Sequence, residues 1–131
     1  MVKWFVREVH ADQALSLLQS SYALASPEFL AAEVGNVLLK KIRRGEMQRD
    51  DTDEALDIIE IFVSLVESRS LFDSAFATAL QHNRSFYDAL YVALALNRGC
   101  QLVTADERLY NALRPALPET MLWVGDLPAL G

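Results

Sequence analysis

The chain has 131 residues, of which 52% are hydrophobic and 23% are charged. This length suits one domain around a single core, and the composition is that of a globular protein, which excludes a disordered chain. The net charge of −6 argues against broad nucleic-acid affinity through a basic surface. The charge is compatible with an acidic pocket whose bound cations contact the phosphate of a substrate, because the positive charge of the ions adds to the charge of the protein there.

Neither a membrane segment nor a signal for export is predicted. The longest apolar stretch, near Ile58 to Val66, is interrupted by Glu60 and Ser64, whereas a spanning helix needs about 20 apolar residues. The N-terminus carries charges and no apolar signal core. The single cysteine, Cys100, cannot form an internal disulfide, which fits a cytoplasmic protein.

In chain order, helices alternate with short extended segments. From the N-terminus, the predicted elements are a helix over His10–Ser20, an apolar segment at Tyr22–Ala25, helices over Glu28–Arg43 and Arg49–Leu65, an extended piece at Val66–Ser68, helices over Leu71–His82 and Phe86–Asn97, a strand at Gln101–Thr104, a helix over Asp106–Leu113 and a last strand at Met121–Val124. Ser26 and Pro27 suit the cap and first turn of the second helix. Gly45 and Gly99 suit helix C-termini.

This alternation predicts an α/β fold with a parallel sheet covered on both faces. In such a sheet the ligand site lies at the carboxyl ends of the strands. Asp106 follows the strand Gln101–Thr104 directly, so it is expected at that edge. Few strands are visible for a stable parallel sheet, and a further strand before residue 1 is therefore expected.

Three acidic residues stand in apolar surroundings. Glu33 and Asp88 lie within apolar helical runs, and Asp106 follows a buried strand. Carboxylates rarely lie on a buried face unless they are paired or bound to a cation. Their mutual repulsion would raise their pKa values unless a metal ion offset it. Oxygen ligands favour Mg²⁺ or Mn²⁺ over zinc, and two histidines and one cysteine offer no competing cluster.

Each acid also has a purely structural interpretation. Glu33 suits a solvated position on an amphipathic helix, Asp88 suits an acidic first turn, and Asp106 suits an N-cap. Thr104 suits an ordinary strand residue. A basic run follows Glu33 and comprises Lys40, Lys41, Arg43 and Arg44. It could bind RNA phosphate, or it could be a solvated helix end whose positive charge complements the helix dipole. The residues alone therefore predict an α/β domain that carries an acidic, metal-binding site or three capping acids.

In their order and spacing, several segments resemble the PIN domain, and within it the VapC toxins of bacterial toxin–antitoxin pairs. Lys3-Trp4-Phe5 resembles the segment after the first strand of the family, and Arg44-Gly45-Glu46 resembles a turn. Residues 27–38, 85–95 and 102–109 resemble the segments that carry the second, third and fourth acids, here Glu33, Asp88 and Asp106.

The resemblance implies a three-layer α/β/α sandwich with a short central parallel sheet, and a metal-dependent endoribonuclease. Glu33, Asp88 and Asp106 would hold Mg²⁺ or Mn²⁺ and the attacking water, and Thr104 would support the site through its hydroxyl. The implied partners are an RNA substrate, a VapB-like antitoxin whose C-terminal segment blocks the site, and a second copy of the chain in a homodimer.

The sequence departs from the family pattern at its N-terminus. That pattern begins with a central hydrophobic strand ending in aspartate, whereas Met1 stands two residues before Lys3. Residues 1–131 are therefore expected to form one PIN-like domain that is N-terminally short, through a misplaced start, a truncation or degeneration. The alternative function is a catalytically inactive PIN-fold module that sequesters antitoxin or RNA. A third alternative is a structural α/β domain whose acids are caps.

Overall fold

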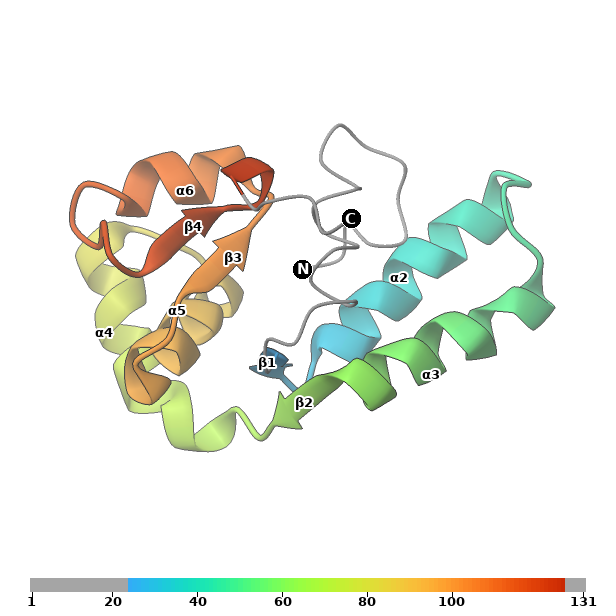
Figure 1. The fold of residues 1–131 in the computed structure, drawn as a ribbon, viewed down its shortest axis with the longest axis horizontal. Coiled ribbons are helices and arrows are strands. Elements are labelled where there is room, and N and C mark those ends of the chain that lie inside the picture. Colours follow the sequence, from blue (N-terminus) through green and yellow to red (C-terminus); the bar gives the residue numbers. More distant parts are fainter. Residues whose placement is uncertain (1–23, 127–131) are drawn as a thin grey trace.

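The computed structural model describes residues 24–126 (Figure 1). Five α-helices and four short strands alternate along this part of the chain. In order, they are β1 (Leu24–Pro27), α2 (Leu30–Arg43), α3 (Thr52–Phe62), β2 (Val63–Val66), α4 (Phe72–His82), α5 (Phe86–Arg98), β3 (Leu102–Thr104), α6 (Glu107–Leu113) and β4 (Met121–Trp123). The expected helix over His10–Ser20 lies outside the described residues.

The strands form two parallel pairs. β1 pairs with β2, with Leu24 opposite Val63, and β3 pairs with β4, with Leu102 opposite Met121. Within residues 24–126, the central layer is thus divided into two two-stranded sheets rather than joined in one. The strands are parallel as expected. In the described part, β1 and β3 each have a strand partner along one edge and none along the other.

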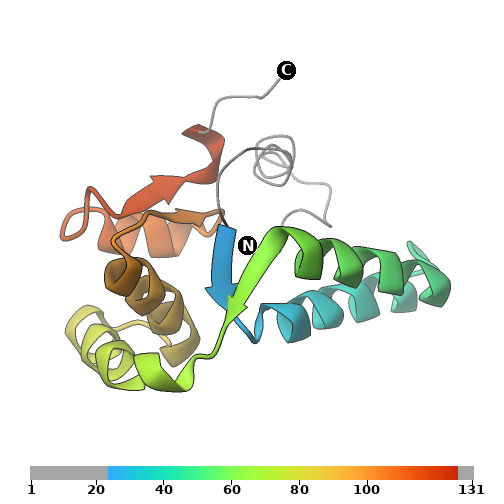
Figure 2. The same ribbon diagram turned by 60° about the horizontal axis from the view of Figure 1, so that its bottom comes forward.

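Helices cover both faces of this central layer (Figures 1 and 2). On one face α2 and α3 pack together over Leu65 and Val103, around the fully buried Leu30 and Ile59. On the other face α4 and α5 pack over Val66, while α5 and α6 enclose β3 and β4. Because neighbours such as Leu65 and Val66 point to opposite faces, each strand contributes to both helical layers. This is the expected three-layer α/β/α sandwich.

The start of the second helix was predicted wrongly. Ser26 and Pro27 are the last two residues of β1 rather than the cap and first turn of α2, which begins only at Leu30. Proline fits here because β1 ends at this residue, and the next backbone N–H, that of Glu28, donates to the carbonyl of Val66 at 2.9 Å. The buried Ser26 hydroxyl is thereby left at the carboxyl end of the strand.

The third helix was predicted too long. It ends at Phe62, and β2 begins directly at Val63, where the prediction continued the helix to Leu65 and put an extended piece at Val66–Ser68. The helical pattern of α3 runs into the apolar strand without a glycine or proline to mark the change. From Val63 onward the chain is a strand because its backbone N–H and C=O groups hydrogen bond to β1. In a longer helix the same groups would bond within the helix.

The remaining described elements agree with the prediction to within a residue or two. α5 ends at Gly99, whose φ of 62° needs the left-handed conformation that glycine adopts readily. The fourth and sixth predicted helices correspond to α4 and α6, and the last two strands to β3 and β4. Within the described residues, no helix combines the length and apolarity that crossing a membrane requires.

Candidate active site

Asp88 lies in the first turn of α5, where a serine cap fixes the helix start. The Ser85 hydroxyl accepts a hydrogen bond from the backbone N–H of Asp88 at 3.1 Å. The residues after Asp88 on its helix are buried, with Ala89 and Leu90 in the core, so that the carboxylate lies at the border of the apolar layer. Asp88 itself is half-buried. The helix therefore presents a carboxylate in a partly desolvated position.

Asp106 and Thr104 are held at the end of β3. The Thr104 hydroxyl accepts a hydrogen bond from the backbone N–H of Asp106 at 3.0 Å, and Thr104 is buried. One carboxylate oxygen of Asp106 accepts from the backbone N–H of Leu109 at 3.1 Å, which makes Asp106 the N-cap of α6. The capping interpretation is confirmed. It leaves the second oxygen of this exposed carboxylate available for another interaction.

The charge of Asp106 acts on Asp88. Burial raises the pKa of Asp88, and the nearby Asp106 carboxylate raises it further. The hydrogen bond at Ser85 and the charge of Arg84 oppose this rise without cancelling it. The guanidinium of Arg84 in turn donates to the carbonyl oxygen of Arg108 at 3.5 Å, which links the loop before α5 to α6. Two acids that are distant in sequence therefore share one local field.

Glu33 lies in the first turn of α2, and Tyr91 is its hydrogen-bond partner. The Tyr91 hydroxyl donates to Oε1 of Glu33 at 2.7 Å. Burial raises the pKa of Tyr91 strongly, and the bond to Glu33 and the negative charges of Glu33 and Asp88 add to the rise. Because the phenol keeps its proton at neutral pH, it acts as a donor to the carboxylate. Glu33 is thus not simply a solvated position on α2.

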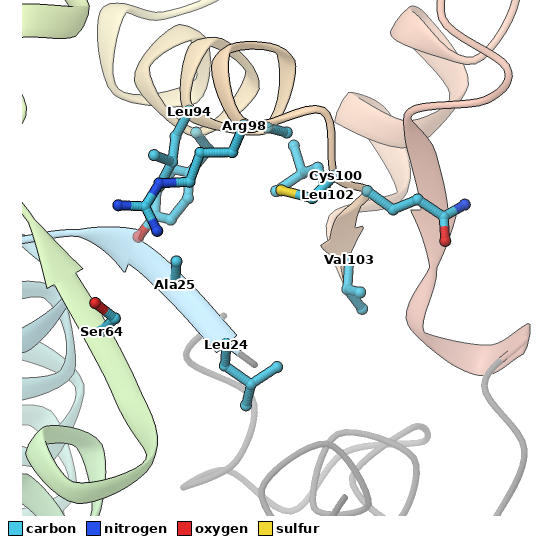
Figure 3. Close-up of a pocket in the computed structure, with 11 residues that line it drawn as sticks. Leu24, Ala25, Ser64, Leu94, Arg98, Cys100, Leu102 and Val103 are labelled. Atoms are coloured by element: carbon cyan, nitrogen blue, oxygen red, sulfur yellow. The ribbon is translucent and has the colours of Figure 1, made fainter. Parts of the chain in front are cut away.

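The two sheets flank a cavity of about 480 Å³ (Figure 3). Leu24 and Ala25 of β1 line it on one side, Leu102 and Val103 of β3 on the other, and α5 contributes Tyr91, Leu94, Ala95 and Arg98. The cavity is mostly apolar, and Tyr91 belongs both to its wall and to the Glu33 hydrogen bond. Tyr91 therefore links the wall of the cavity to Glu33.

The donor chemistry of the acids fits a hard divalent cation, since carboxylate oxygens are the ligands that Mg²⁺ and Mn²⁺ prefer. The described residues do not, however, gather three histidine, cysteine, aspartate or glutamate side chains into one group that could hold a metal ion. Asp88 and Asp106 are coupled, while Glu33 is joined to them through Tyr91. Within residues 24–126, these three carboxylates are thus brought into one region without forming a complete ligand group.

Comparison with known proteins settles the family. Residues 1–114 match the PIN domain. The chain belongs to the PIN-domain family. It is 34% identical over 116 residues to Ribonuclease VapC3 of Pyrobaculum aerophilum, an alignment that covers 86% of this chain and 88% of the relative. It is 37% identical over 102 residues to Ribonuclease VapC1 of Mycobacterium tuberculosis, with 78% of this chain and 74% of the relative covered.

Two residues of this PIN domain were missed by sequence reasoning. Tyr91 follows Asp88 by three residues, so both occupy one face of α5, and that spacing could have drawn attention to it. Ser26 lies near the Tyr91 hydroxyl at the end of β1 and opposes the rise in its pKa, a position that its interpretation as a helix cap concealed.

The basic run of the PIN domain lies in the last turn of α2 and just beyond it. Ten residues separate Glu33 from Arg43, which places Arg43 about 15 Å further along the helix axis at 1.5 Å per residue. Lys41 lies 3.5 Å from Glu46 in an ion pair. These charges suit the helix C-terminus and lie apart from the acids.

Proposed function

We propose that this PIN domain is a metal-dependent endoribonuclease that acts as the toxin of a toxin–antitoxin pair and hydrolyses RNA phosphodiester bonds. The observation that carries the proposal is the hydrogen bond of 2.7 Å by which Tyr91, one helical turn after Asp88, holds Glu33 close to the helix that carries Asp88. The Asp106 carboxylate is near enough to raise the pKa of Asp88. A carboxyl pKa raised by burial and by a second carboxylate is common at sites that hold cations or move protons. The relatives named as ribonucleases support the substrate class.

In this proposal Glu33, Asp88 and Asp106 hold a divalent cation, Mg²⁺ or Mn²⁺. When bound, the cation would offer Lewis acidity to the phosphate and make a bound water more acidic. The chain's own part is positional: Ser85 fixes the first turn that carries Asp88, and Leu109 fixes one oxygen of Asp106. The Thr104 hydroxyl accepts from the backbone before α6, and its own hydrogen remains to be donated.

Replacement of the half-buried acid tests the proposal. We expect Asp88→Asn to lower Mg²⁺-dependent cleavage of an end-labelled RNA by roughly 10²-fold or more, because the amide removes a negative oxygen ligand and a proton acceptor. The assay uses the full chain, with EDTA as the metal-free reference. Asp73→Asn is the matched control, because Asp73 is also a first-turn acid but is exposed on α4. Full cleavage by Asp88→Asn would remove the site assignment.

One observation favours a second function, that of a PIN-fold binding module without catalysis. No three potential ligands gather around one cation position in residues 24–126. A module of this kind would bind an antitoxin or RNA without cutting it. An RNA that is retained on the protein and recovered intact in the presence of Mn²⁺ would support the binding module over the enzyme.

The proposed partners are a VapB-like antitoxin and a second copy of the chain. The net charge of −6 suits a basic antitoxin segment. For the homodimer, α4 offers Phe76 and Leu80, four residues apart on one helix face and 56% and 84% exposed. A cytoplasmic location follows from the proposed substrate.

The dimer surface can be tested directly. We expect Leu80→Glu to shift the mass measured by light scattering from dimer to monomer, because a charge on the α4 face would have to be buried in the interface. Ile61→Glu is the control, since Ile61 is a similarly exposed apolar residue on α3. A dimer that survives Leu80→Glu and dissociates with Ile61→Glu would place the interface on α3 instead.

A further inference from the structure

The bond between Tyr91 and Glu33 joins the two helices that carry acids. Glu33 belongs to α2, and Tyr91 belongs to α5 one helical turn after Asp88. The Tyr91 hydroxyl and Oε1 of Glu33 are 2.7 Å apart, although 58 residues separate them in sequence. Because Asp88 and Tyr91 share a helix face, this bond fixes the Glu33 carboxylate relative to the Asp88 carboxylate.

The phenol ring of Tyr91 is itself held in place. The Phe29 ring meets it edge to face, with ring centroids 5.4 Å apart and an interplanar angle of 83°. Ser26, buried at the end of β1, lies near the Tyr91 hydroxyl and opposes the rise in its pKa, while its own hydroxyl donates to the carbonyl of Pro27 at 3.2 Å. A ring packed from one side and bonded at its hydroxyl has little rotamer freedom, so it can hold a carboxylate in one orientation.

Glu33 keeps capacity for a second partner. Its Oε1 accepts from Tyr91, and no hydrogen bond to Oε2 is shown within the described part of the chain. An ionised carboxylate offers about four lone-pair sites. One oxygen can therefore remain on the phenol while the other takes a cation, which is how outer partners commonly orient carboxylate ligands.

We propose that Tyr91 is a positioning residue, which orients Glu33 so that its free oxygen can join Asp88 and Asp106 around a divalent cation. The inference rests on the proposed function, since it concerns the metal affinity of that same site. Tyr91 itself touches neither cation nor substrate. Its role differs from that of an ordinary interhelical contact, because it acts on the affinity for the cation through Glu33.

Mn²⁺ binding without RNA provides the test. Isothermal titration of the full chain with MnCl₂ is expected to show a dissociation constant at least about tenfold higher for Tyr91→Phe than for the unsubstituted chain, as is typical when a partner of a ligand is lost. Tyr87→Phe is the matched control. Tyr87 lies on the same helix and contacts the same Phe29 ring at 5.2 Å, but it is 64% exposed and makes no hydrogen bond shown in the described residues.

Two further measurements separate positioning from a merely structural role. In a Glu33→Gln background, Tyr91→Phe is expected to change the Mn²⁺ affinity less than twofold, because Tyr91 acts only through the Glu33 carboxylate. RNA cleavage by Tyr91→Phe is expected to recover towards that of the unsubstituted chain at saturating Mn²⁺, while Tyr87→Phe needs no additional cation. A structural defect would not be relieved by more cation.

The outcomes are distinct. If Tyr91→Phe binds Mn²⁺ as tightly as the unsubstituted chain, or more tightly, the positioning role is overturned while the proposed nuclease stands. Equal losses from Tyr91→Phe with and without the Glu33→Gln substitution would also overturn it. If the unsubstituted chain binds no Mn²⁺ and cleaves no RNA, the proposed function fails, and the inference about Tyr91 fails with it.

Discussion

At the scale of single residues, the negative charge of Asp88 lowers the stability of the folded chain. Burial and the Asp106 carboxylate hold its pKa above the ordinary value of 3.8. The folded chain therefore binds this proton more tightly than the unfolded chain does. The penalty is absent below pH 3.8, grows as the pH rises towards the folded pKa, and is fully present above it.

This sign gives a stability prediction. At pH 7 we expect Asp88→Asn to raise the melting temperature by roughly 1–3 °C, because the amide removes a partly desolvated charge and its repulsion by Asp106. At pH 3 the two chains should melt together, since the aspartate is then protonated in both states. Thermal unfolding followed by circular dichroism at both pH values checks this. A lower melting temperature for Asp88→Asn at pH 7 would contradict it, with exposed Asp73→Asn as the reference.

The sequence draws attention to the three acids, but not to Tyr91, the hydrogen-bond partner of Glu33. Glu33, Asp88 and Asp106 stand out because carboxylates are unusual in apolar runs. Tyr91 does not, because a tyrosine within the apolar sequence of α5 is typical of an ordinary core residue. Only the packing of α5 against α2 brings its hydroxyl to Glu33, and that contact spans 58 residues.

At the scale of elements, the first turn of α5 sets the position of Asp88. The Ser85 cap satisfies the backbone N–H of Asp88 itself. We expect Ser85→Ala to lower the free energy of unfolding by about 1 kcal/mol. The loss is also expected to reduce RNA cleavage, because the turn that carries Asp88 frays. Urea unfolding measures the first effect, and Ser74→Ala, an exposed position within α4, is the control. Equal stability of the two variants would show that the cap contributes nothing.

The sequence predicts most helices well and β2 poorly, for a physical reason. The helices have caps and apolar spacing within their own residues, such as Ser85 and Gly99 around α5. Val63–Val66 has no such local signal, because it is a strand only through its pairing with β1. For the same reason Ser26 and Pro27 were assigned to a helix start, although their neighbours across the sheet are Leu65 and Val66.

At the scale of the whole molecule, the central layer is divided. β1 and β3 each have one strand partner in the described part, and the apolar cavity lies between them (Figure 3). Within residues 24–126, β1 and β3 therefore each present one edge that a further parallel strand would fit.

The wall of that cavity also includes Cys100, the one cysteine in the sequence, whose thiol is free and exposed. The rate at which this thiol reacts therefore reports whether the cavity is occupied. Alkylation by a maleimide dye modifies a single defined position, so the rate needs no assignment among several thiols. We expect slow labelling when a strand fills the space and fast labelling when the space is open, in the folded protein and without substrate. The labelling rate of Cys100 would then show whether a strand lies between β1 and β3.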